Sequence, residues 1–110
     1  MASGDKYGMV TGKVKATGAA LQVEIPFTPR KVFVFNLTTA ASLEWTYPMP
    51  DAAGVKRVTA GNQTYVTADG ITPTEAYVLD HATDKRGFKI GALADINDTT
   101  TEFLIWAAWA

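Results

Sequence analysis

Apolar and polar side chains alternate along several stretches of this chain. Residues 21–27, Leu-Gln-Val-Glu-Ile-Pro-Phe, place an apolar side chain at almost every second position. This is the period of a half-buried β-strand, because successive residues of a strand point to opposite faces. Residues 42–47 repeat the pattern, with Leu43, Trp45 and Tyr47 on one face. Pro26 lacks an amide donor, so we expect the first strand to lie at a sheet edge or to end nearby.

Two further stretches are apolar on both faces. In residues 31–37, Val32 and Val34 face one way, while Phe33, Phe35 and Leu37 face the other. Such a pattern predicts a central strand that is covered on both sides. Residues 103–110, Phe-Leu-Ile-Trp-Ala-Ala-Trp-Ala, form the most apolar stretch and predict another strand.

The remaining strand candidates are shorter, and turn residues separate them. They are residues 55–59, 64–67, 76–79 and 88–91, with turns at 60–63 and 84–87 and a polar loop at 95–100. The alanines at 92–94 and 107–110 also suit a short helix by propensity. An apolar stripe with helical spacing is nevertheless not sustained over three turns anywhere in the chain.

Together these elements predict an all-β fold, a single small β-sandwich or β-barrel domain with a flexible N-terminal arm. A chain of 110 residues fits one domain. We expect the β domain to cover residues 19–110. Residues 1–18 are polar and rich in glycine, with few apolar anchors, so we expect them to be a poorly ordered arm.

Charge and composition exclude several classes of function. The 10 basic and 11 acidic residues nearly cancel, and the basic residues are dispersed, whereas nucleic-acid binding needs clustered positive charge. The absence of cysteine removes disulfides, thiolate metal sites and cysteine nucleophiles. The longest apolar run is far shorter than the roughly 20 residues of a membrane helix, and the start lacks an apolar signal region, so we expect a soluble protein made in the cytoplasm.

Candidate chemistry is sparse. His81 lies between Asp80 and Asp84 and could act as a general base if a nucleophile faced it, but a loop histidine beside solvated aspartates is the simpler interpretation. Residues 95–99 resemble a calcium loop superficially, yet Thr100 and Trp106 stand where an EF-hand needs glycine and glutamate. We therefore expect no catalytic residue, no metal site and no cofactor.

Three Asn-x-Thr triplets begin at Asn36, Asn62 and Asn97. In a secreted eukaryotic chain they would be glycan acceptors. Without a signal peptide, chance is the simplest explanation for them.

The aromatic residues leave two alternatives open. Trp106 and Trp109 either fill the core or lie between subunits, since interfaces often enlist tryptophan. The residues that we regard as a possible subunit or capsid interface are Phe27, Trp45, Tyr47, Phe103, Trp106 and Trp109.

Several short segments resemble a known group of proteins. They are Pro26-Phe27-Thr28-Pro29-Arg30-Lys31-Val32, Leu43-Glu44-Trp45, Val58-Thr59-Ala60-Gly61-Asn62-Gln63-Thr64, Gly70-Ile71-Thr72, and Gly87-Phe88-Lys89-Ile90-Gly91 followed by Asp95-Ile96-Asn97. In this order they resemble short virion structural proteins of tailed bacteriophages, over about residues 20 to 110. The segments are strand and turn motifs without a chemical group, so no functional residue is carried over.

The resemblance implies a head decoration or cement protein on the capsid surface of the virion. Its partner would be the major capsid protein, and it would be a homo-oligomer, with a trimer favoured. The alternative is a tail or fibre component that recognises a host surface glycan, for which Tyr7, Trp45, Tyr47 and Tyr65 are the candidate stacking rings. Neither alternative involves nucleic acid or a membrane.

Overall fold

The chain forms one antiparallel β-sheet. The computed structural model describes residues 8–74 and 86–110. The strands are β1 (Met9–Lys15), β2 (Leu21–Glu24), β3 (Lys31–Asn36), β4 (Ser42–Thr46), β5 (Ala53–Arg57), β6 (Gln63–Thr74), β7 (Gly87–Ile90) and β8 (Phe103–Trp109). Their order in the sheet is β1-β8-β3-β4-β5-β6-β7-β2. No helix occurs in the described residues, and the all-β prediction is confirmed.

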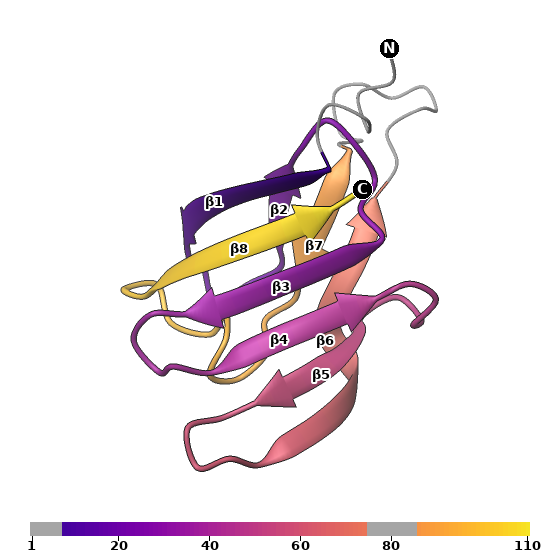
Figure 1. Cartoon of the computed structure of the whole chain (residues 1–110). Coiled ribbons are helices and arrows are strands. Elements are labelled where there is room, and N and C mark those ends of the chain that lie inside the picture. Colours follow the sequence, from indigo (N-terminus) through magenta and orange to yellow (C-terminus); the bar gives the residue numbers. More distant parts are fainter. Residues whose placement is uncertain (1–7, 75–85) are drawn as a thin grey trace.

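The sheet curls into a half-barrel. Strands β7 and β2 lie behind β8 and β3, so that the two ends of one sheet face each other across the core (Figure 1). In the described residues β1 pairs only with β8 and β2 only with β7, so the barrel is open between these two edges. The expected sandwich or barrel is therefore a single curled sheet.

The core follows from the two-residue period of the strands. The inward residues of β3 and β4 are Val32, Val34, Leu43 and Trp45, and each is at most 1% exposed. From the opposite wall come buried residues of β6, β7 and β2, namely Ile71, Phe88, Ile90 and Val23. Phe88 meets Trp106 of β8 edge to face, with ring centroids 5.4 Å apart. Such aromatic pairs add to the hydrophobic gain of burial.

Strand β3 is central, between β8 and β4, as its sequence predicts. The expectation that both of its faces are covered is wrong for the described part of the chain. Val32 and Val34 are fully buried, whereas Phe33 and Phe35 are half-buried on the other side. The reason is that one curled sheet covers its concave side only, and no second layer of described strands lies across its convex side.

The N-terminal region differs from the sequence prediction. Part of the range assigned to an arm, residues 9–15, is β1 and pairs with β8 from Met9–Trp109 to Lys15–Phe103. The inward positions 10, 12 and 14 carry valine, glycine and valine, which suits a strand over a core. Residues 1–7, the strand candidate at 76–79 and His81 lie outside the described residues.

The weaker strand candidates correspond to β5, β6 and β7. The expected turn at 60–63 joins β5 to β6, and the Val58 amide donates to the Asn62 carbonyl at 3.2 Å. Strand β6 is longer than expected because its first part pairs with β5 and its second part, residues 71–74, pairs with β7. It bends between the two parts, where the register with β5 shifts between Ala53 and Gly54. The bend brings Gly70 against the Ala53 backbone, where a side chain would not fit.

Residues 91–102 close one end of the half-barrel. This segment contains no strand and places the fully buried Ile96 against the core. Two buried asparagines hold it. Asn36 donates to the Ile96 carbonyl at 2.9 Å, and Asn97 donates to the carbonyls of Ala19 and Ile90 at 2.7 and 3.2 Å.

Candidate functional site

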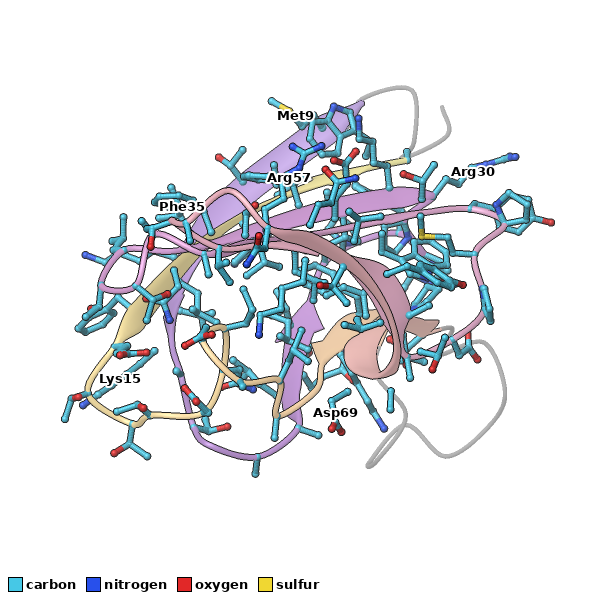
Figure 2. The ribbon with its side chains drawn as sticks, turned by 90° about the horizontal axis from the view of Figure 1, so that it is seen from below. Met9, Lys15, Arg30, Phe35, Arg57 and Asp69 are labelled. Carbon is cyan, nitrogen blue, oxygen red and sulfur yellow. The ribbon has the colours of Figure 1, made fainter. Side chains whose placement is uncertain are left out.

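The convex side of strands β1, β8 and β3 is a continuous apolar surface, which we call the outer face. Its members share an outward side chain in the paired registers of these three strands. They are Met9, Thr11, Lys13, Lys15, Lys31, Phe33, Phe35, Phe103, Ile105, Ala107 and Trp109. Met9 and Phe35 project on the same side of the molecule, opposite Asp69 (Figure 2).

The apolar members of the outer face are accessible to solvent. Met9 is 51% exposed, Phe103 42% and Ile105 40%, while Phe33, Phe35 and Trp109 are half-buried. Single exposed apolar residues are ordinary, but contiguous apolar patches on a small domain mark interaction surfaces. The outer face is such a patch, because its members are neighbours across adjacent strands.

A hollow of about 440 Å³ lies in the centre of this face. It is bordered by Phe33 of β3, Ile105 and Ala107 of β8, and Thr11 and Lys13 of β1, and Gly12 and Trp106 complete its lining. The short side chain of Ala107 leaves this space between its partners on the neighbouring strands, Thr11 and Phe33. Gly12 faces the core instead, where a Cβ would come within 2.5 Å of the Trp106 ring.

The lysines of the outer face lie over its aromatic rings. The Lys13 and Lys15 Nζ atoms are 4.8 and 6.0 Å from the Phe103 ring centroid, and Lys31 Nζ is 5.0 Å from that of Trp109. These distances suit cation–π contacts. The lysine stems thus extend the apolar surface, while their charged ends mark its border.

The structure divides the six aromatic residues that the sequence singled out. Phe27, Trp45 and Trp106 are core residues, at 7%, 1% and 9% exposure, so their side chains are not available to a partner. Phe103 and Trp109 belong to the outer face. Tyr47 directly follows the last residue of β4 and is exposed outside the outer face. The Arg30 guanidinium lies 5.0 Å from the centroid of its ring.

Sequence reasoning did not include Met9, Phe33, Phe35 and Ile105 in the candidate interface. The signal is present, since residues 31–37 and 103–110 are apolar on both faces, but for residues 31–37 it predicts a strand covered on both sides, which hides Phe33 and Phe35 from the list. Met9 belongs to a stretch, residues 9–15, in which Val10 and Val14 alternate with polar residues and so indicate a strand. The indication is weak because Gly12 stands between the two valines on their side of the strand.

A second hollow, of about 480 Å³, opens at the Tyr47 end of the half-barrel. Its lining residues are Thr28, Pro29, Arg30, Trp45, Tyr47, Met49, Asp51 and Pro73. The Trp45 indole donates to the Pro50 carbonyl at 3.0 Å, and the Thr28 hydroxyl donates to the Thr74 carbonyl at 2.9 Å. The Tyr47 ring, the Arg30 guanidinium and the Asp51 carboxylate are its remaining polar or aromatic features.

The other sequence candidates carry no site in the described residues. Within them no group of three or more His, Cys, Asp or Glu side chains could hold a metal ion. In the 95–99 loop, Asp98 accepts from the Asp95 amide at 3.2 Å, and Asp95 pairs with Lys56 at 3.4 Å. A search of residues 8–74 and 86–110 finds no helix that could cross a membrane.

The structure shows where the asparagines of the three Asn-x-Thr triplets lie. The Asn36 and Asn97 side chains are fully buried, so neither can accept a glycan in the folded protein. Both are structural residues that hold the 91–102 segment. Asn62 is exposed in the turn between β5 and β6.

Comparisons of the chain with protein-family models, with curated proteins and with solved structures find no match.

Proposed function

We propose that this chain is a virion structural protein of a tailed bacteriophage, which decorates and stabilises the capsid by binding capsid subunits and performs no catalysis. The observation that carries the proposal is the outer face, an apolar surface that spans three strands and that no other described strand covers. The resemblance of residues 20–110 to such proteins indicates the kind of partner.

The physical action requires only binding. A protein that binds the assembled lattice, and not its separated subunits, stabilises the lattice by mass action. If one copy contacts two capsid subunits, or if several copies bind as a trimer, the linked contacts strengthen one another through a high effective concentration. An apolar surface suits this role because it gains free energy when water is excluded from it.

Sedimentation tests the proposal directly. Purified protein is mixed with expanded, undecorated phage heads and, separately, with intact host cells, and the bound fraction is measured after pelleting. We expect saturable binding to heads at a fixed ratio per capsomer, together with greater resistance of the heads to heat. No binding to heads would overturn the proposal. Analytical ultracentrifugation of the free protein tests the trimer.

The hollow at the Tyr47 end favours a second candidate, a tail or fibre component that recognises a host glycan. An exposed tyrosine ring can stack on a sugar face, and the Arg30 and Asp51 side chains can bond to hydroxyl groups. This candidate predicts binding to host cells that is lost in Tyr47→Ala. Phe103→Ala is the matched control, because Phe103 is an aromatic residue that is 42% exposed on the outer face and does not line this hollow.

A further inference from the structure

Positive charge borders the outer face. Lys13 and Lys15 project from β1 and Lys31 from β3, and the next cation across the sheet is Arg57 of β5, which shares a row with Lys13. None of the outward residues of β1, β8 and β3 is acidic. The neighbouring carboxylate of Glu44, on β4, is paired with Lys31 at 3.4 Å.

The central hollow adds a requirement of shape. It is apolar at its rim, through Phe33, Ile105 and Ala107, and Lys13 of β1 also lines it, while Lys31 lies further along β3. An apolar side chain that protrudes from a partner would fill it. Carboxylates around that side chain would meet the lysine ammonium groups without displacing them from the aromatic rings, because an ammonium group has several donors.

We infer that the outer face docks on a capsid surface from which an apolar side chain protrudes among carboxylates. The inference rests on the proposed function and specifies the chemistry of its partner. A second copy of the chain fits less well, because it would bring lysines against lysines. A phosphate backbone would match the lysines but would leave Met9, Ile105 and Phe103 in water.

The test compares two double variants that make the same change of charge. Lys13→Glu/Lys15→Glu reverses the β1 side of the outer face, and Arg86→Glu/Lys89→Glu is the matched control on the far wall of the half-barrel, where both residues are exposed. Binding to undecorated heads is measured at low and high salt, about 0.05 and about 0.5 M NaCl, since salt screens exposed charges. We expect the β1 variant to bind about 10- to 100-fold more weakly at low salt, with a smaller loss at high salt, and the control to bind normally.

A third variant tests the hollow. Ala107→Leu fills it without a change of charge, so we expect weaker binding that does not depend on salt. Circular dichroism and the unfolding midpoint establish that each variant folds, and the charge variants alter exposed positions that the fold does not need.

The outcomes separate the two proposals. If the unaltered protein does not bind heads, the proposed function fails, and the inference fails with it. If the unaltered protein binds heads and the β1 and Ala107→Leu variants bind equally well, only the inference is overturned. Binding of the purified protein to anionic lipid vesicles in place of heads, or a dimer that Lys13→Glu/Lys15→Glu strengthens, would also overturn the inference.

Discussion

The replacement Asn97→Asp should destabilise the fold far more than its size suggests. Asn97 is fully buried, and the two hydrogens of its amide nitrogen are shared among three carbonyls, those of Ala19 at 2.7 Å and of Ile90 and Gly91 at 3.2 Å. Its side-chain oxygen accepts from the Thr17 amide at 2.8 Å. Aspartate has the same shape, so the change creates no cavity. It replaces the donor with a second acceptor that faces three acceptors.

The magnitude follows from these bonds. The net contribution of each hydrogen bond is about 1 kcal/mol, so the loss of both amide hydrogens costs about 2 kcal/mol. Burial of a carboxylate without a cationic partner adds a further penalty, so about 2 kcal/mol is a lower bound at neutral pH. For a domain of this length, a loss of about 2 kcal/mol corresponds to a decrease in Tm of about 8 °C.

Urea unfolding followed by tryptophan fluorescence measures this effect, because Trp45 and Trp106 are buried. Asn62→Asp is the matched control. It makes the same chemical change within another Asn-x-Thr triplet, at an exposed turn, and should alter the free energy of unfolding by less than about 0.5 kcal/mol. Equal stability of the two variants would refute the assignment of Asn97 as a buried structural donor.

Two further predictions concern the core. Gly12→Ala should lower the free energy of unfolding by about 1–3 kcal/mol, because the new Cβ would lie 2.5 Å from the Trp106 ring; Gly8→Ala, with no atom within 4 Å of its Cβ, should change little in the same urea titration. Trp45→Ala should cost about 3–5 kcal/mol by thermal unfolding, whereas Tyr47→Ala at the exposed end of the strand should cost less than about 1 kcal/mol. A stable Trp45→Ala protein would contradict the placement of that ring in the core.

The amino-acid pattern was sufficient to predict most strands and the all-β class. In residues 31–36 and 42–46 the alternation assigns Val32, Val34, Leu43 and Trp45 to shared faces, and these four are the buried apolar side chains of β3 and β4. Prediction succeeds here because the direction of a side chain along a strand depends only on its position, even or odd.

The sequence did not determine which face of each strand would be covered. Phe33 and Phe35 look like core residues on hydrophobicity alone, as do Trp106 and Trp109. Their environments depend on pairings between distant parts of the chain, above all the insertion of β8 between β1 and β3. These pairings also recruit residues 9–15 as a strand, although by composition those residues resemble a loose arm.

The candidate binding surface is therefore a product of tertiary structure. Local pattern supplies strands with two apolar faces, but a single curled sheet has only one concave side in which to bury them. Its convex side leaves Met9, Ile105 and Phe103 in contact with water. Curvature and strand order arise from the packing of the whole chain, and they decide which apolar residues stabilise the fold and which remain for a partner.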